Sequence, residues 1–584
     1  MTESKVKPKF TSNALRVLQT RYLKKNEARQ VIETPRQMFE RVAKNIAAAD
    51  RLYDSRADVA VTAREFYELM ASLEFLPNSP TLMNAGTPLQ QLAACYVLPV
   101  EDDMRSIFDA VKHMALIQQG GGGTGFSFSR LRPKNDLVRT SMGLASGPVS
   151  FMRAFNAATD VIKQGGRRKG ANMGMLRVDH PDILEFVKAK EKEGEFSNFN
   201  ISVGITDEFM RALKRGSDYA LVNPRTKKVV GRLNARAVFR TIAETAWKNG
   251  EPGVVFIDTV NAVNPTPALG AIESTNPCGE QPLLPYESCT LGSINLLKTL
   301  CEGPGGKEVD WQKLKKTVWT AVHFLDNVVD ASRSPVKQVD EVTRGNRKIG
   351  LGVMGFADFL VELGISYASA EAVETAEEVM SFVQKESKAA SAALAQKRGV
   401  FPNYTKSVYA RKGPRLRNAT TTTIAPAGTL SIIAGCSSGI EPFFGIAFTR
   451  TVLDGVVLPE TNRLFEKTAK KRGFYSKSLM NKIAALGSAQ SLKEVPAEVR
   501  KLFVTAQDIP FQQHALIQAA FQKHVDNAVS KTINFAYNAS PRDVEKAFLL
   551  AYELHCKGVA VYRNKSRTEQ VLSRGSSKAS YSEP

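Results

Sequence analysis

Short apolar segments with the composition of β-strands alternate with amphipathic helical segments through most of this chain. Residues 93–98 form one such segment, and apolar residues at helical spacing follow it from Met104 to Ala115. Residues 531–535 are also predicted as a strand, followed by a helix that Ser540 and Pro541 begin and that reaches about Cys556. Strands that alternate with helices indicate an α/β architecture built around one large sheet or barrel.

The two ends of the chain differ from this middle part. Residues 1–72 are charged and helical in pattern, with helix starts expected at Thr34 and, from a capping-box spacing, at Thr62. We therefore expect a small helical N-terminal region over 1–72 and a main α/β domain over 73–567. Within that domain we predict a long helix over 372–398, capped by Ser369, and a β-branched strand over 420–424. Residues 568–584 are polar and rich in serine, so disorder is expected there.

Composition excludes several classes of protein. The chain has no run of eighteen apolar residues and its first residues lack an apolar signal segment, so we expect no membrane span and a cytoplasmic location. The six cysteines form no Cys-x-x-Cys pair and the histidines are scattered, so we expect no metal site built from side chains. The formal charge of +21 favours anionic ligands, nucleotides or nucleic acid, although solvated basic faces account for most of these residues.

A thiol flanked by an amide and a carboxylate is the strongest chemical signal in the sequence. Asn276, Cys278 and Glu280 stand two residues apart, separated by Pro277 and Gly279. Proline fixes one φ angle and glycine relaxes another, which is typical of a tight loop. In a looped backbone the three side chains can project to one side and address one small volume. A turn with a buried free thiol is the simpler interpretation, but the flanking residues favour a hydrogen-bonding, radical-carrying and proton-transferring trio.

Three glycine-rich segments suit a close approach of the backbone to a ligand. Residues 425–431 have the pattern of a strand-to-helix turn, whose backbone amides bind phosphate. Residues 120–125 and 165–172 are expected to be irregular loops, and neither has the spacing of a Walker or dinucleotide motif. A flexible hairpin is the alternative for 120–125. Cys95 and Cys289 stand in apolar segments, where a free cysteine usually packs in the core.

Five motifs, in this order, resemble the catalytic subunit of ribonucleotide reductase, most closely its adenosylcobalamin-dependent (class II) branch. They are LPNSPTLMNAG (76–86), ACYVLP (94–99), GGGTGF (121–126), NPCGE (276–280) and APAGT (425–429), and the resemblance extends over about residues 10–572. It implies a ten-stranded α/β barrel of two five-stranded halves with a central finger loop that carries Cys278. The implied activity is the reduction of ribonucleotides, taken as diphosphates, to 2′-deoxyribonucleotides by thiyl-radical chemistry.

The resemblance also implies a role for each catalytic residue. Cys278 would carry the thiyl radical that abstracts the 3′-hydrogen of the ribose, Glu280 would take the 3′-hydroxyl proton, and Asn276 would hydrogen-bond the ribose hydroxyls. Cys95 and Cys289 would be the reducing pair, which is oxidised to a disulfide as the 2′-hydroxyl leaves as water.

Further positions match nucleotide-binding residues of the family. Those that match the substrate site are Ser79, Thr81, Ala94, Gly122, Gly123, Pro426, Ala427, Gly428, Thr429 and Leu430, the last five around the phosphates. Those that match the deoxynucleoside triphosphate effector site, or the loop that carries its signal to the substrate, are Asp102, Arg132, Gln164 and Arg168. The resemblance implies specificity control at this second site, without an ATP/dATP on–off switch at the N-terminus.

The radical source separates the branches of the family. Class I passes a radical through a tyrosine pair, and the matching stretch here holds only Tyr562. The surroundings of Gly575 do not resemble a glycyl-radical motif. Adenosylcobalamin is therefore the expected cofactor, because homolysis of its cobalt–carbon bond supplies the radical. A subunit that takes its radical from a partner, and a catalytically idle nucleotide-binding regulator, remain as alternatives.

The expected partners follow from the same resemblance. Besides ribonucleotide and effector, we expect a homodimer, with no membrane and no nucleic-acid partner. The family commonly has a C-terminal cysteine pair that re-reduces the catalytic thiols, and no cysteine follows Cys556 here. An external reductant, a thioredoxin-like protein or a small dithiol, is therefore expected. The resemblance does not explain the high positive charge.

Overall fold

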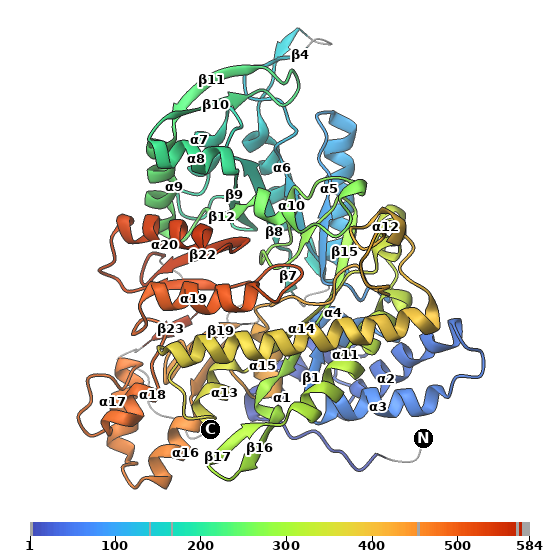
Figure 1. The fold of residues 1–584 in the computed structure, drawn as a ribbon, viewed down its shortest axis with the longest axis vertical. Helices are drawn as coiled ribbons and strands as arrows, with labels where there is room; N and C mark the ends of the chain where they lie inside the picture. The colour runs from blue at the N-terminus through green and yellow to red at the C-terminus, as the bar shows by residue number, and fades with distance from the viewer. Residues whose placement is uncertain (1–3, 139–141, 165–167, 453–455, 568–571, 575–584) are drawn as a thin grey trace.

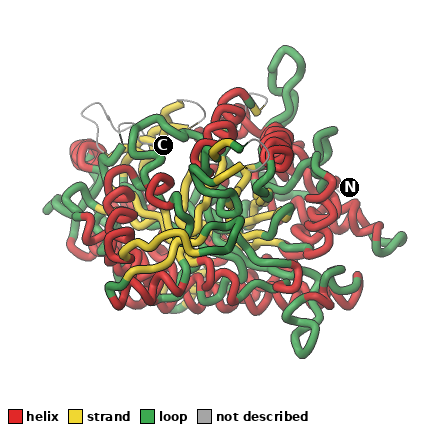
Figure 2. The backbone as a smooth tube through the Cα atoms, turned by 90° about the horizontal axis from the view of Figure 1, so that it is seen from above, coloured by secondary structure: helices red, strands yellow, loops and turns green. Residues whose placement is uncertain are grey.

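The computed structural model describes residues 4–138, 142–164, 168–452, 456–567 and 572–574. A helical N-terminal region adjoins one large mixed sheet that helices enclose (Figure 1). Seen from above, the strands gather in the middle of the molecule and the helices lie outside them (Figure 2). This arrangement of layers is typical of an α/β barrel.

Three α-helices form most of the N-terminal region. They are α1 (Ser12–Val17), α2 (Pro35–Ala47) and α3 (Val59–Ala71). The predicted start at Thr34 is confirmed, because its side chain accepts from Gln37 N and the Gln37 side chain binds the Thr34 backbone. The start predicted at Thr62 was wrong. Asp58 caps α3 by accepting from two backbone amides, and Thr62 lies inside the helix with its hydroxyl donating to Asp50.

Five parallel strands form the first half of the barrel. In spatial order they are β2 (Cys95–Leu98), β3 (Gly123–Ser127), β8 (Asn172–Arg177), β9 (Phe199–Ile205) and β12 (Gly253–Phe256). Parallel neighbours need crossover connections, and α5 (Met104–Gln119) and α6 (Pro148–Val161) are the first two of these. Most residues of the five strands are buried, as expected where structure covers both faces of a parallel sheet.

β3 corrects the expectation that residues 120–125 are irregular throughout. Gly123 and Gly125 are strand residues. A Cβ atom at Gly125 would lie 1.7 Å from the carbonyl oxygen of Thr275, and one at Gly123 would lie 3.0 Å from Cγ of Pro277. Glycine is therefore needed inside this strand because the backbone of the Cys278 loop lies directly against it.

The second half of the barrel repeats this arrangement with β15 (Glu287–Asn295), β18 (Ile349–Met354), β21 (Thr532–Phe535) and β22 (Gly558–Arg563). β15 and β18 are parallel, as are β21 and β22, and residues 420–424 run between the two pairs. Antiparallel pairs β2–β15 and β12–β22 join the halves. Regular pairing does not close the ring, but isolated bridges from Thr422 to Leu351 and from Ile424 to Val529 span the gap. The predicted α/β barrel is confirmed.

The regular strand predicted over 420–424 is reduced to these two bridges. The Thr423 hydroxyl donates to the Glu280 carbonyl at 2.9 Å, the Thr420 hydroxyl donates to the Ile349 carbonyl at 3.2 Å, and Thr421 N donates to a side chain. Side-chain to backbone bonds of this kind compete with ladder bonds. The segment thereby contacts the Cys278 loop instead of forming a regular strand.

A ring of helices covers the outside of the barrel. Besides α5 and α6 it includes α9 (Ala235–Asn249), α11 (Trp311–Ala331), α14 (Ala370–Arg398), α19 (Phe511–Gln522) and α20 (Pro541–Glu553). α14 lies beside α11 and α19, and its predicted cap at Ser369 is confirmed (Figure 1). None of the helices in the described ranges is long and apolar enough to cross a membrane.

The tail that was expected to be disordered includes a short strand. β23 (Leu572–Arg574) pairs antiparallel with β19 (Ala447–Val452), which also pairs with β20 (Val456–Thr461). For these three residues the expectation of disorder was wrong, because pairing with β19 gives their backbone hydrogen-bond partners. Residues 568–571 and 575–584 lie outside the described residues.

Candidate active site

A hairpin carries the Cys278 loop into the barrel. Its arms, β13 (Ser274–Thr275) and β14 (Pro282–Leu283), pair antiparallel, and β13 contacts β2, β3 and β8. Gly279 N donates to the Asn276 carbonyl at 3.0 Å and closes a four-residue turn, and Gly279 has a φ of 82°. Glycine adopts this left-handed conformation without steric cost. The turn places Cys278 at its tip, where the side chain is exposed.

Hydrogen bonds from both halves of the barrel hold this loop. Asn200 of β9 donates through Nδ2 to the Pro277 carbonyl at 2.8 Å. From the other half, Ala528 N and the Thr423 hydroxyl both donate to the Glu280 carbonyl, at 3.0 and 2.9 Å. Bonds from rigid elements on both sides restrict the position of the loop, as a reacting group at its tip requires.

We expect Gly125→Ala to lower turnover by about 100-fold, because a displacement of about 1 Å of a reacting group has that effect. The added Cβ would overlap the Thr275 carbonyl, so the hairpin arm must move. Steady-state kinetics and a thermal melt check this. Gly231→Ala is the matched control, because a Cβ there meets only Leu221 at an ordinary 3.6 Å. Turnover of Gly125→Ala equal to that of the control would contradict the prediction.

Cys95 and Cys289 lie opposite each other on neighbouring strands. They are Cα partners in the antiparallel pair β2–β15. Opposed residues in such a pair have Cα atoms about 4.5–5.5 Å apart, inside the range of about 4.4–6.8 Å seen for disulfides. Both thiols are buried, at 4% and 0% exposure. The pair is therefore placed to form a disulfide without rearrangement of the strands.

Asn276 and Glu280 both face Cys95. Asn276 donates through Nδ2 to Cys95 Sγ at 3.1 Å, and its Oδ1 accepts from Gln281 N at 3.0 Å. The Cys95 thiol donates to Glu280 Oε1 at 3.9 Å. Burial raises the pKa of the Cys95 thiol well above its ordinary value, and the Glu280 carboxyl raises it further. An amide, a carboxyl and a protonated thiol thus meet behind the exposed Cys278.

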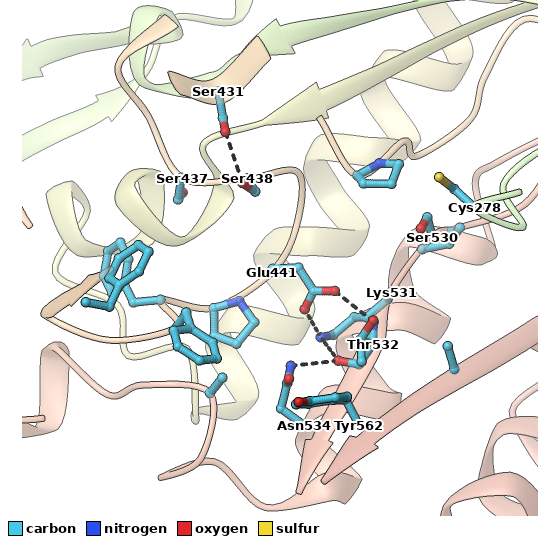
Figure 3. Close-up of a pocket in the computed structure, with 18 of the residues that line it drawn as sticks. Cys278, Ser431, Ser437, Ser438, Glu441, Ser530, Lys531, Thr532, Asn534 and Tyr562 are labelled. Carbon is cyan, nitrogen blue, oxygen red and sulfur yellow. Dashed lines mark hydrogen bonds and ion pairs between the residues drawn. The ribbon is translucent and has the colours of Figure 1, made fainter. Parts of the chain in front are cut away.

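A cavity of about 920 Å³ lies beside the finger loop. Cys278 lines it together with Pro426 and with Ser431 of α15 (Gly428–Ala434). Figure 3 shows Cys278 facing the same space as a carboxylate–ammonium pair, in which Glu441 Oε2 lies 2.6 Å from Lys531 Nζ. Across the described ranges, no group of three or more His, Cys, Asp or Glu side chains is placed to hold a metal ion.

Sequence reasoning did not single out the polar wall of this cavity. Thr532 and Asn534 line the cavity, whereas Ile533 and Phe535 between and after them are buried in the core. Lys531 precedes them and is fully buried at its side chain. Polar residues at alternate positions of the predicted strand 531–535 were the available signal, because successive side chains of a strand point to opposite faces.

Two of the predicted substrate-binding residues belong to the start of α4 (Ser79–Asn84). The Ser79 hydroxyl hydrogen-bonds that of Tyr22 at 2.7 Å. Thr81 is fully buried, and its hydroxyl lies 3.0 Å from both Asn78 Oδ1 and the Leu92 carbonyl. The Thr81 hydroxyl is therefore engaged inside the protein.

The other predicted substrate-binding residues lie before β2, at the start of β3 and in the turn that begins α15. Ala94 packs against the cluster that contains Cys95 and Cys289, and so does Ala425 at the start of the predicted phosphate turn. In that turn Ala427 has a φ of 52° and precedes α15, so residues 428–430 form its first turn. A Cβ at the neighbouring Gly122 would lie 2.6 Å from Tyr96.

Two of the predicted effector residues lie beyond the end of β2 that is away from Cys95, and the other two precede β8 at the opposite end of the sheet. Asp102 follows the strand that Cys95 begins, and its carboxylate accepts from Arg132 Nε at 2.8 Å. Gln164 and Arg168 belong to the paired short strands β6 (Lys163–Gln164) and β7 (Arg168–Lys169). Residues 165–167 of the glycine-rich loop between them lie outside the described residues.

Two family models match nearly the whole chain. The model described as the all-alpha domain of ribonucleotide reductase matches residues 8–90, and the one described as its barrel domain matches residues 93–562. The chain belongs to the ribonucleotide reductase family. The match confirms the resemblance inferred from the five motifs.

Curated relatives of this reductase include vitamin B12-dependent enzymes. The chain is 51% identical to the vitamin B12-dependent ribonucleoside-diphosphate reductase of Thermoplasma acidophilum, with 97% of this chain and 80% of the relative covered. It is 48% identical to the protein of the same name from Mycobacterium tuberculosis, with 98% and 82% covered. Identity to a ribonucleoside-diphosphate reductase subunit alpha of Chlamydia muridarum is 26%, over 96% of this chain and 59% of that protein.

A solved structure supports the fold. The chain superposes on the Actinobacillus ureae class Id ribonucleotide reductase alpha subunit with a TM-score of 0.77, covering 95% of this chain and 97% of that one. The sequences are 22% identical, so this likeness concerns the fold alone.

Proposed function

We propose that this reductase converts ribonucleoside diphosphates to 2′-deoxyribonucleotides with a thiyl radical on Cys278. The observation that supports this most directly is the placement of three thiols. Cys278 stands exposed at the tip of the finger loop and lines the cavity, while Cys95 and Cys289 are opposed on adjacent strands behind it. One sulfur can thus relay a hydrogen atom, and two can supply electrons.

The proposed reaction moves one hydrogen atom to and from Cys278 and takes two electrons from the Cys95–Cys289 pair. The Cys278 radical takes the 3′-hydrogen of the ribose, Glu280 takes the proton of the 3′-hydroxyl, and Asn276 holds the ribose hydroxyls. Cys95 and Cys289 give two electrons and two protons, so the 2′-hydroxyl leaves as water and the two sulfurs form a disulfide. Glu280 then returns its proton to the 3′-oxygen, and Cys278 returns its hydrogen atom to the 3′-carbon. The buried Cys95 thiol, whose raised pKa keeps it protonated, suits hydrogen donation.

Adenosylcobalamin is the cofactor in this proposal, as in the relatives named vitamin B12-dependent. When bound, it supplies a carbon radical by homolysis of its cobalt–carbon bond. The cavity beside Cys278 has a volume of about 920 Å³, at the upper end of ligand pockets of about 300–1,000 Å³, and can take the part of such a group that reaches Cys278. Ser437, Ser438, Asn534 and Tyr562 line it and would hold the amide and hydroxyl groups of the cofactor.

The nucleotide sites complete the proposal. We assign the substrate phosphates to the turn 426–430, beside Ser79, Ala94, Gly122 and Gly123, with Thr81 supporting Ser79 from within α4. We assign a deoxynucleoside triphosphate effector to Asp102 and Arg132. Gln164 and Arg168 lie on the segment that we expect to transmit the identity of the bound effector to the substrate site. A homodimer, a cytoplasmic location and re-reduction by a thioredoxin-like protein or small dithiol are further parts of the proposal.

A single-turnover assay tests the chemistry. Prereduced protein is mixed with adenosylcobalamin and each ribonucleoside diphosphate, without added dithiol. We expect about one deoxynucleotide per chain, accompanied by loss of the Cys95 and Cys289 thiols in mass spectrometry. Product that appears only after a metal-containing second subunit is added would support a class I subunit instead. Nucleotide binding without product under either condition would support a regulator.

A further inference from the structure

An ion pair that the proposed reaction does not use lies inside the barrel, next to the paired thiols. Lys348 Nζ lies 2.7 Å from Glu287 Oε2, and the two side chains are 1% and 0% exposed. Asn346 Nδ2 donates to the other carboxylate oxygen at 2.7 Å. The desolvation cost of such a pair often cancels its attraction, so stability alone does not explain why it is there.

Strand register places this pair beside Cys289. Glu287 and Cys289 stand two residues apart on β15, so their side chains share one face. In the parallel pair β15–β18, Thr290 is the partner of Ile349, which puts Lys348 next to Cys289. The Cys289 thiol donates to the Lys348 carbonyl at 3.4 Å. Cys95, Cys289 and Lys348 thus lie side by side across the barrel wall.

The Cys95 thiol consequently has a carboxylate as its main charged neighbour, and the Cys289 thiol has an ammonium group. Burial raises the pKa of both. After burial, the largest influence on Cys95 is the Glu280 carboxyl, which raises its pKa, whereas the largest on Cys289 is the Lys348 ammonium, which lowers it. Glu287 and Glu280 also face Cys289 and oppose Lys348 with smaller effects.

A further charged group, Lys557, lies near this pair. Lys557, which precedes β22, donates to the carbonyls of Asp526 and Asn527, and its ammonium faces Lys348. Lys557 is not among the main influences on the pKa of either thiol. A negative charge is therefore better accommodated at Cys289 than at Cys95.

We propose that the Lys348–Glu287 pair sets the direction of disulfide exchange, so that an incoming thiolate attacks Cys95 and Cys289 leaves. This inference rests on the proposed function, because it concerns reduction of the disulfide formed in turnover. One thiolate of an external dithiol bonds to Cys95 Sγ as the Cys95–Cys289 bond breaks, and Cys289 departs as a thiolate. The second thiol of the reductant, after losing its proton, displaces Cys95. The reductant ends as a disulfide, and both cysteines take up the released protons.

The test measures the rate of disulfide reduction and the position of attack. The oxidised wild-type protein is treated with dithiothreitol for the rate, and with glutathione, followed by mass spectrometry, for the mixed disulfide. Glu287→Gln leaves Lys348 without a counter-charge, while the glutamine oxygen can still accept from Lys348 and from Leu284 N, as Glu287 Oε2 does at 2.7 and 2.8 Å. We expect reduction to accelerate about threefold, because a leaving thiol of lower pKa departs faster.

The double variant Lys348→Met/Glu287→Gln should change the rate in the opposite direction. It removes both charges, so no unpaired charge remains buried, and we expect slower reduction and loss of the preference for glutathione on Cys95. Lys307→Met is the control, because this lysine pairs with Glu362 at 2.7 Å and neither residue is among the influences on the pKa of Cys95 or Cys289. Its rate should equal that of the wild type.

Loosened packing would change both rates in one direction, so opposite changes identify the charges as the cause. Glutathione on Cys289 in the wild type, or equal rates in the two Glu287 variants, would overturn the inference. Failure of the wild type to form the Cys95–Cys289 disulfide during turnover would instead overturn the proposed function.

Discussion

Cys278→Ala is expected to abolish deoxynucleotide formation and to leave nucleotide binding intact. The alanine removes the sulfur that starts the reaction, and losses on the order of 10⁴-fold or more are typical when the reacting group itself is deleted. The side chain is exposed at the loop tip, and backbone bonds to Asn200, Thr423 and Ala528 hold the loop without it. The free energy of unfolding should therefore change by no more than about 0.5 kcal/mol.

Two measurements separate this result from general damage. Product formation is followed in single-turnover and steady-state assays, and ribonucleoside diphosphate binding is followed by calorimetry. Cys301→Ala is the matched control, because Cys301 is a thiol on the separate hairpin of β16 (Leu300–Gly303) and β17 (Gly306–Val309). Residual turnover of Cys278→Ala above a few per cent of the control would contradict the role proposed for this thiol.

Local signals, which are strand and helix periodicity and the cap at Ser369, predicted an α/β architecture. The family resemblance, carried by the order of five motifs along the chain, specified the ten-stranded barrel. Predictions failed where a distant segment decides the conformation. Gly123 and Gly125 belong to a strand because the finger loop lies against them, and residues 420–424 lose regular pairing because their threonines bind other backbones. Neither contact has a signature near those positions.

The candidate site divides in the same way. The spacing of Asn276, Cys278 and Glu280 within one turn was visible in the sequence, and their roles remain predictions. The pairing of Cys95 with Cys289 depends on the register of β2 against β15, which the barrel as a whole sets. From the residues alone, core packing was the usual interpretation of both cysteines. Only the family resemblance predicted that they form a redox pair.

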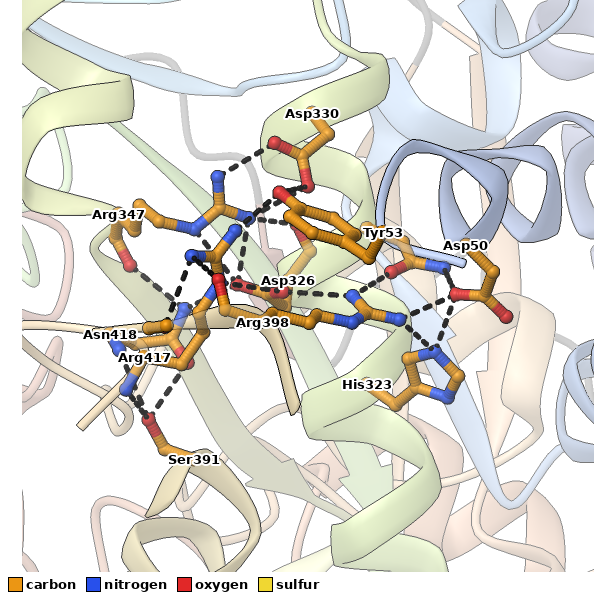
Figure 4. Close-up of polar contacts among 12 residues, drawn as sticks. Asp50, Tyr53, His323, Asp326, Asp330, Arg347, Ser391, Arg398, Arg417 and Asn418 are labelled. Carbon is orange, nitrogen blue, oxygen red and sulfur yellow. Dashed lines mark hydrogen bonds and ion pairs between the residues drawn. The ribbon is translucent and has the colours of Figure 1, made fainter. Parts of the chain in front are cut away.

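Asp326→Asn is expected to lower the free energy of unfolding by about 3–5 kcal/mol, the usual cost of breaking a buried ion pair. Asp326 on α11 is fully buried, and its carboxylate accepts from Arg347 at 2.8 Å, from Arg398 at 3.0 Å and from Asn418 at 3.0 Å (Figure 4). An uncharged amide would leave the buried guanidinium groups without their shared counter-charge. Chemical denaturation followed by circular dichroism measures the loss.

The same cluster attaches the N-terminal region to the barrel. Arg398 also binds Asp50 at 2.6 Å, and the guanidinium groups of Arg398 and Arg417 each lie 4.8 Å from the ring centroid of Tyr53. A guanidinium group released from Asp326 would move away from these partners. Hydrogen exchange in Asp326→Asn should therefore increase first in the residues around Asp50 and in the helices that contact α11.

Acid should reveal the same interaction in the wild type. Burial alone would raise the pKa of Asp326, but the charges of Arg347 and Arg417 outweigh it and hold the pKa below its ordinary value. The folded state therefore binds this proton less readily than the unfolded chain, so the carboxylate stabilises the fold above about pH 4 and less as the pH falls further. Asp326→Asn should lack this component, whereas Glu341→Gln, which removes an exposed partner of Lys337, should keep it. Equal stability of Asp326→Asn and wild type at pH 7 would show that the three arginines do not need this carboxylate.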